Sequence, residues 1–127
     1  MRKTHIMMGI CVLLVSVVIQ TGGNQVVWAE EGNFLFSSIS NNTWALDKST
    51  RQLILFNFEK PDQVWKSNPI IIPDTFDLSA CRLEAVGVRG SAVFLLDTSG
   101  GQITFYDAQH DGSVKAFKIV NIKESLK

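Results

Sequence analysis

The chain carries an internal repeat with a fixed spacing of 50 residues. The segment TWALDKSTRQLILFNF at 43–58 is followed by VFLLDTSGGQITFYDA at 93–108. The two segments align without a gap, so that Asp47 meets Asp97 and Leu53 meets Ile103. A period of this length, with several short strands per unit, is typical of propeller blades and related sheet repeats. The repeat therefore predicts two copies of one β-sheet unit.

Short β-branched and aromatic runs, separated by turn residues, make up most of the chain after residue 32. No helical periodicity persists over a useful length, and this combination indicates an all-β domain. We predict two tandem four-stranded antiparallel blade-like repeats, over about 33–72 and 81–121, packed like propeller blades or as a small sandwich. The expected strands are 33–38, 43–47, 52–58, 63–66, 69–72, 81–88, 92–97, 102–107 and 113–121.

The first 29 residues differ from the rest of the chain. A short basic start precedes Ile6–Ile19, an uncharged apolar run of 14 residues, and a polar stretch then leads to Ala29. This order predicts a secretory signal peptide at 1–29 and one domain at 30–127. The alternative is an uncleaved anchor, but a spanning helix needs about 20 residues, so no stable membrane span is expected after cleavage. Export to a bacterial periplasm or the cell exterior is expected.

Charge and cysteine content narrow the function classes. Residues 30–127 hold ten Lys and Arg against twelve Asp and Glu, with no basic cluster. A dedicated nucleic-acid surface needs clustered Lys and Arg, so none is expected. Cys81 is the only cysteine of this part, and it alternates with Arg82 in a strand pattern that places it among apolar residues. A buried thiol is therefore favoured over a disulfide to a partner.

Residues 45–55, ALDKSTRQLIL, resemble the repeat of quinoprotein-type β-propellers. That repeat has Ala-Leu-Asp, two variable residues, Thr-Gly-Lys, two more residues and Trp. Residues 45–47 and Thr50 match it, while Arg51, Gln52 and Leu55 replace Gly, Lys and Trp. Residues 95–105 match at Leu96, Asp97 and Gly101. The resemblance implies the shape of a propeller blade. Because proteins of that family hold their quinone in a full ring of blades, the resemblance implies no cofactor for a chain with two blades.

Asp47 and Asp97 stand at equivalent places, each at the end of a strand and before a turn. Such an Asp accepts hydrogen bonds from turn N–H groups two or three residues further on. We expect both residues to lock hairpins, and Trp44 and Phe94 to serve as matched packing anchors. Paired carboxylates for glycoside chemistry are the alternative. The matched turn positions favour the structural role.

Catalytic and metal motifs are weak. Ser91 lies in RGSA, which is not the Gly-x-Ser-x-Gly elbow, and a small hydrolase using Ser91 and His110 stays an alternative. Asp107, His110 and Asp111 cluster near a turn, but zinc needs three or four ligands of the Cys and His type. We expect no metal and no cofactor.

The remaining class of function is the binding of a ligand or a protein partner at the protein surface. Trp65, Tyr106 and Arg51 are candidates for a ligand or partner surface. Exposed edges of two small sheets favour self-association or docking to a protein partner. The sequence predicts an exported, non-catalytic binding or interaction protein. The alternatives are a carbohydrate-binding module that oligomerises into a closed propeller, and an accessory subunit of an exported redox or envelope complex.

The places where the two copies differ are better functional candidates than the places where they agree. Arg51 stands against Gly101, Trp65 against Lys115, and Pro61-Asp62 against Asp111-Gly112. A shared residue serves the shared fold, whereas a residue found in one copy is free to serve a ligand.

Overall fold

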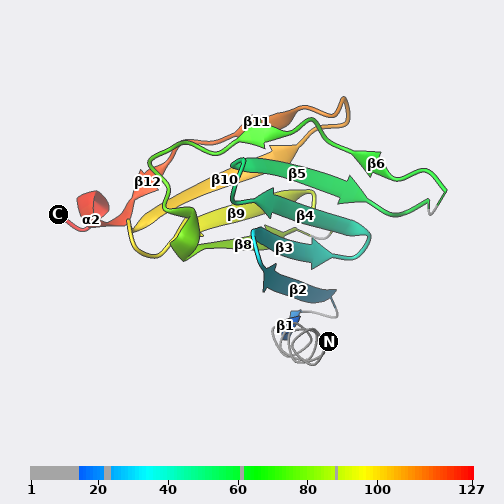
Figure 1. Ribbon diagram of the computed structural model, residues 1–127, viewed down its shortest axis with the longest axis horizontal. Helices are drawn as coiled ribbons and strands as arrows, with labels where there is room; N and C mark the ends of the chain where they lie inside the picture. Colours follow the sequence, from blue (N-terminus) through cyan, green and yellow to red (C-terminus); the bar gives the residue numbers. More distant parts are fainter. Residues whose placement is uncertain (1–14, 22–23, 61, 88) are drawn as a thin grey trace, which may run out of the picture.

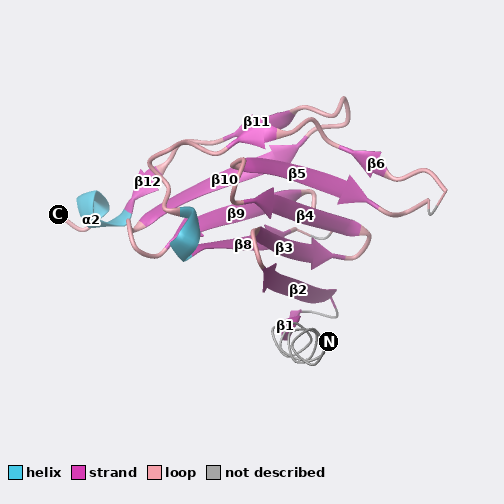
Figure 2. Ribbon diagram, in the orientation of Figure 1, coloured by secondary structure: helices cyan, strands magenta, loops and turns pink. Residues whose placement is uncertain are grey.

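The computed structural model describes residues 15–21, 24–60, 62–87 and 89–127 (Figure 1). Within these residues the fold is all-β, built from two antiparallel sheets of which neither closes into a barrel (Figure 2). The predicted fold class is confirmed.

The first sheet holds the first repeat. Its strands follow the chain in the order β1-β2-β3-β4-β5-β6, and β7 also pairs with β5. Because β6 and β7 contact opposite ends of β5, they act as two halves of one interrupted outer strand. The strands are β1 (Val15–Thr21), β2 (Asn24–Glu31), β3 (Phe34–Ile39), β4 (Asn42–Asp47), β5 (Gln52–Asn57), β6 (Trp65–Lys66) and β7 (Ile70–Ile71).

The second sheet holds the second repeat in the order β11-β10-β9-β8, with β12 also on β10. A 3₁₀ helix (Leu78–Ala80) enters it and a four-residue helix, α2 (Ile122–Ser125), follows it. The prediction of one strand over 113–121 is wrong, because β11 and β12 are separated as β6 and β7 are. The strands are β8 (Cys81–Val86), β9 (Ala92–Asp97), β10 (Gln102–Ala108), β11 (Val114–Ala116) and β12 (Val120–Asn121).

The two repeats share one backbone framework. Strands β4 and β9 begin at residues 42 and 92, and β5 and β10 begin at 52 and 102. Hydrogen bonds repeat at the same spacing: Ile72 N donates to Arg51 O and Ile122 N donates to Gly101 O, both at 2.8 Å. The duplication read from the sequence is therefore also a duplication of backbone structure.

Strands β1 and β2 extend the first sheet beyond β3, through part of the predicted signal peptide. Residues 1–14 and 22–23 of that segment lie outside the described residues. No strand was expected at 15–21 or 24–31, yet β2 pairs with β3 from Val26 to Glu31. Cleavage after Ala29 would remove β1 and most of β2. No helix in the described part of the chain has the length and apolarity needed to cross a membrane.

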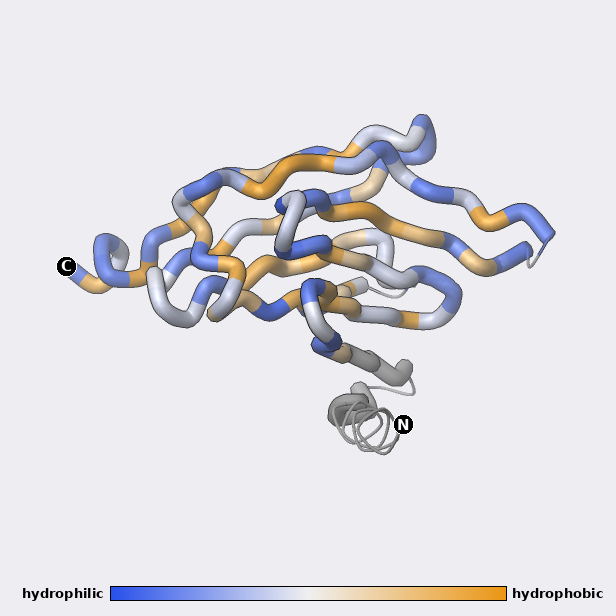
Figure 3. Tube along the Cα trace, viewed as in Figure 1, coloured by the Kyte–Doolittle hydropathy of each residue, from blue (hydrophilic) through white to orange (hydrophobic). Residues whose placement is uncertain are grey.

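One apolar core lies between the two sheets, which overlap in the view of Figure 1. Trp44 is fully buried, and its Nε1 donates to Gly90 O at 3.0 Å across the two repeats. Strand β3 packs on β8, where Ala85 N donates to Ser37 Oγ at 2.8 Å. Figure 3 shows hydrophobic residues along the central strands and hydrophilic residues at the turns.

The two repeats bury opposite faces of equivalent strands. In β4 the inward residues include Trp44 and Leu46, whose equivalents in β9 are Phe94 and Leu96. In β9, however, Val93 and Leu95 face inward, and Phe94 is 36% exposed. The expectation that Phe94 matches Trp44 as a core anchor is therefore wrong.

This burial pattern has a geometric consequence. A two-fold sandwich would bury the same face of both sheets. Here the second sheet presents its opposite face, so equivalent faces of the two sheets do not meet.

Candidate functional site

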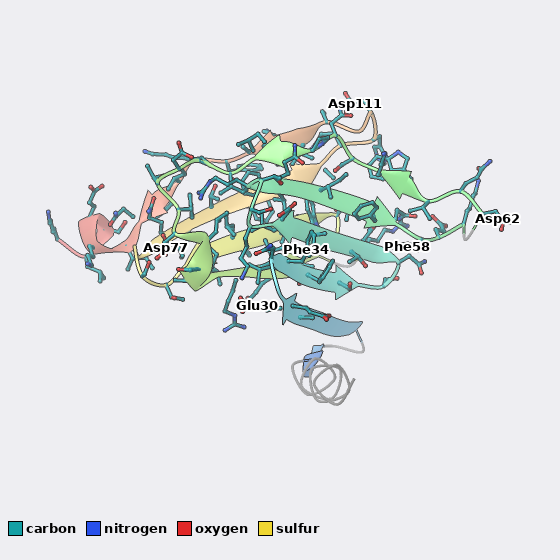
Figure 4. All side chains as sticks on the ribbon, in the orientation of Figure 1. Glu30, Phe34, Phe58, Asp62, Asp77 and Asp111 are labelled. Carbon is teal, nitrogen blue, oxygen red and sulfur yellow. The ribbon has the colours of Figure 1, made fainter. Side chains whose placement is uncertain are left out.

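A pocket of about 610 Å³ lies at one end of the two sheets. The β5–β6 connection and Trp65 form one side of it. The β8–β9 connection and the chain just after β10 form the other side. In Figure 4, Asp62 and Asp111 lie on two of the turns toward this end, while Asp77 lies toward the opposite end. We call this cavity the loop-end pocket.

Side-chain amides connect the two repeats beneath the pocket. Asn57 Nδ2 donates to Asn42 Oδ1 at 2.7 Å, and Asn42 Nδ2 donates to the carbonyl oxygen of Arg89. The amide of Glu59 N donates in turn to Asn57 Oδ1 at 3.0 Å. Asn42 is buried, and a satisfied buried network of this kind rigidifies its surroundings. The amide chain thus holds the walls of the pocket in one arrangement.

The walls combine apolar and polar surface. Trp65 is 39% exposed and stands beside the exposed Val64. Gln109 and His110 contribute polar groups from the second repeat. Aromatic rings with a few placed polar groups are the usual lining of a small-molecule site, because the ring supplies contact area and the polar groups supply orientation.

A second set of bonds ties the two walls together outside the pocket. Asn68 N donates to Gly112 O at 2.7 Å, which joins the β6–β7 connection to the β10–β11 turn. Within that turn Asp111 Oδ1 accepts from Ser113 N at 2.9 Å and from Ser113 Oγ at 2.6 Å. These hydrogen bonds from Ser113 lower the pKa of Asp111. At neutral pH the ionised carboxylate of Asp111 therefore holds this turn in place through its hydrogen bonds from Ser113.

Ser91 and His110 both line the loop-end pocket. Among the described residues no hydrogen bond joins their side chains, and Ser91 instead uses its carbonyl oxygen to accept from Ala108 N at 3.0 Å. The chain after Ser91 continues into strand β9 rather than into the helix that follows a nucleophile elbow. Among the described residues, Ser91 and His110 thus share a pocket lining but form no hydrogen-bonded pair.

Arg51 and Tyr106 lie away from the pocket. Arg51 immediately precedes β5, at the end opposite Trp65, and its guanidinium donates to Ile72 O at 3.1 Å and Phe76 O at 2.7 Å. It therefore fastens the connection between the repeats. Tyr106 is buried in the core, where desolvation raises its pKa to about 12. Of the three predicted surface residues, only Trp65 lies at the pocket.

Asp47 and Asp97 hold equivalent turns. Asp47 Oδ1 accepts from Ser49 N at 2.9 Å, and Asp97 Oδ1 accepts from Gly100 N at 2.9 Å. The hydrogen bonds of Ser49 lower the pKa of Asp47. Burial acts to raise the pKa of Asp97, but the amides of Gly100 and Asp77 outweigh it and lower that pKa.

Only Asp97 has a further role between the repeats. Its Oδ2 accepts from Asp77 N at 3.1 Å, so the carboxylate also holds the chain that enters the second sheet. The two carboxylates belong to different turns of different sheets, and neither lines the loop-end pocket. The structure gives them hairpin contacts rather than a shared reaction centre.

Cys81 is a free, buried thiol. Burial, together with the charges of Asp97 and Asp77, raises its pKa to about 12. The thiol is therefore protonated at neutral pH and is a poor nucleophile. In the described part of the chain, no three His, Cys, Asp or Glu side chains gather as a metal site would require.

The residues that sequence reasoning missed are the amides and charges around Trp65. Asn42, Asn57, Glu59 and Arg89 were not singled out, because each resembles an ordinary turn or strand-end residue. One usable signal existed: Trp65 stands against Lys115 where the copies differ, and Trp65 is the residue that lines the pocket.

No family model, curated protein or solved structure matches this chain.

Proposed function

We propose that this chain is an exported, non-catalytic binding protein that takes a small carbohydrate in the loop-end pocket. The observation that carries the proposal is the pocket itself, in which Trp65 of the first repeat faces polar groups of the second. Export rests on the basic start and apolar run of the first 29 residues.

The lining favours a polyhydroxylated ligand. An indole offers a flat apolar face against which the C–H face of a sugar ring can pack. The amide groups of Gln63 and Gln109 each offer both donors and acceptors, as hydroxyl groups require. Glu59 brings a negative charge to the lining, and Lys60 and Arg89 bring positive charges. Hydroxyl groups can donate to Glu59 and accept from Lys60 and Arg89, so a sugar can pair with charges of both signs, whereas a phosphate or a dicarboxylate would meet the like charge of Glu59.

The non-catalytic part of the proposal rests on what the pocket contains. Ser91 and His110 make no hydrogen bond to each other among the described residues, and the fixed amide network beneath them suits recognition. Preorganised polar groups lower the entropic cost of binding.

Trp65→Ala is expected to weaken sugar binding at least about tenfold, because a lost ring contact of roughly 1.4 kcal/mol corresponds to that factor. The measurement is a glycan screen followed by calorimetric titration of the best ligand. Lys115→Ala is the matched control, since it changes the equivalent position of the second repeat, outside the pocket lining. Equal affinities for Trp65→Ala and the unsubstituted protein, or no binding to any glycan, would contradict the proposal.

The export step has its own test. Mass spectrometry of protein recovered outside the cytoplasm is expected to find a chain that begins at Glu30, because small residues precede signal-peptidase sites. Recovery of the full-length chain in the cytoplasm alone would remove this part and leave the pocket argument intact.

A further inference from the structure

The outward face of the second sheet carries an apolar patch, which lies beside Arg82 and Glu84 of β8 and beneath the Lys115 ammonium. Phe94, Phe105 and Phe117 form an aromatic row there, with ring centroids 5.0 Å and 5.1 Å apart. Phe94 and Phe117 are both exposed. We call this the second outer face, and it includes Leu96 and Ile103. A contiguous exposed apolar face of this kind usually marks an interaction site.

The equivalent face of the first sheet is the one buried inside the chain. Phe94 is the counterpart of Trp44, and Phe105 is the counterpart of Leu55, at the 50-residue spacing. Both counterparts are buried against the second sheet. The second outer face therefore has the residues of an inter-repeat contact, and no described strand covers it.

The C-terminal segment follows the same rule. Ile72 is 0% exposed and Phe76 is 1% exposed, because both pack in the core between the repeats. Their counterparts, Ile122 and Leu126, are 40% and 81% exposed. Apolar side chains thus stand exposed at positions whose counterparts are buried between the repeats.

The outward face of the first sheet is the complementary surface. It carries a groove of about 470 Å³ lined by Phe34, Phe36, Ala45, Ile54 and Phe56, which we call the first outer face. The counterparts of its last three residues are Leu95, Thr104 and Tyr106, and all three are buried in the contact between the repeats. Figure 4 shows Phe34 and Phe58 at the two ends of this sheet.

We propose that a second copy of this chain docks head-to-tail, with its second outer face on the first outer face of its neighbour. The internal contact between the repeats is the template for this interface, because each outer face repeats one side of that contact. In this interface the aromatic row of Phe94, Phe105 and Phe117 fills the groove of the neighbouring copy. Within one chain, the equivalent residues Trp44 and Leu55 pack against the second sheet in the same way.

Head-to-tail contacts have a defined outcome. A heterologous interface closes into a ring when the rotation per copy allows it. Natural propellers contain about four to eight blades. Two sheets per chain therefore correspond to a closed ring of about two to four copies.

The first test is the mass of the purified protein by light scattering. We expect a single discrete species of two to four times the mass of one chain, as mass spectrometry of the same sample gives it. Ile54→Lys, in the groove, and Phe94→Lys, in the aromatic row, are each expected to reduce this species to a monomer. Val64→Lys is the matched control, because it places the same charge on an exposed valine of the loop-end pocket and should leave the mass unchanged.

A mixing experiment separates head-to-tail docking from a symmetric dimer. Ile54→Lys keeps an intact second outer face, and Phe94→Lys keeps an intact first outer face. Mixed together, they are expected to form a 1:1 dimer of twice the monomer mass that grows no further. Circular dichroism and a cooperative thermal transition establish that both variants are folded.

Three outcomes would overturn the proposal. One is that the unsubstituted protein stays monomeric at every concentration up to the one used for the calorimetric sugar titration. Another is a mixture of the two folded variants that stays monomeric. The third is dimerisation of either variant alone, because that result requires a face to pair with its own copy. Sugar binding by Trp65 is measured separately, so the failure of either proposal leaves the other standing.

Discussion

Trp44→Ala is expected to lower the free energy of unfolding by about 4 kcal/mol, the usual loss for a fully buried aromatic side chain. The indole is 0% exposed in the core between the sheets. Its Nε1 also donates to Gly90 O at 3.0 Å, so the truncation leaves a cavity and a buried carbonyl without its donor. Urea denaturation followed by circular dichroism measures the change.

Two further variants keep this prediction testable if Trp44→Ala does not fold. Trp44→Phe keeps most of the apolar volume and removes the donor, and we expect a loss of about 1–3 kcal/mol. Phe94→Ala changes the equivalent position on the second outer face and should cost much less in a dilute, monomeric sample, because Phe94 is partly exposed. Equal losses at positions 44 and 94 would show that the two faces are not buried as described.

Gly90→Ala is expected to destabilise the fold by about 3 kcal/mol, from two sources. Gly90 has a φ of 69°, a conformation that costs an L-residue about 1 kcal/mol. A Cβ there would also lie 2.8 Å from Ile39 Cβ and 3.1 Å from Ile39 O. The second contact is with backbone, so relief requires the β8–β9 connection to move away from β3.

Gly101→Ala separates the cost of the positive φ angle from the cost of the close Cβ contact. Gly101 has a φ of 65°, but a Cβ there meets nothing within 4 Å. We expect it to lose only the conformational part, about 1 kcal/mol. The comparison uses thermal or urea unfolding of both variants under one condition. A Gly90→Ala loss no larger than that of Gly101→Ala would argue against close packing between the repeats.

Local chemistry was sufficient for the hairpins. An Asp with a Ser two residues further on, in a turn, forms its hydrogen bonds within three residues, so the turn contacts of Asp47 and Asp97 follow from short-range sequence. The strands of both repeats were also predictable, because alternation and turn residues act over a few positions. The split between β11 and β12 was not anticipated, because residues 117–119, FKI, lack the Ser-Asn-Pro of 67–69 that marks the equivalent break in the first repeat.

The candidate site was less accessible from the sequence. Trp65 was identified because the two copies differ there, whereas Tyr106 and Arg51 were placed in the wrong environment. In the sequence Tyr106 resembles an exposed aromatic residue, but in the structure the first sheet covers it. In the sequence Arg51 resembles a surface charge, but in the structure the carbonyl oxygens of residues 72–76 accept its hydrogen bonds.

The sequence by itself determined the repeat, which shows as matching residues at a fixed spacing of 50. It also determined the all-β class and the positions of the turns, because these depend on neighbours a few residues apart. Only the tertiary structure decided which face of each sheet is buried. Trp44 and Phe94 are both large and apolar at equivalent positions, so no local pattern distinguishes the core residue from the exposed one. That choice depends on how one sheet stacks on the next, and the loop-end pocket and the two apolar outer faces follow from the same stacking.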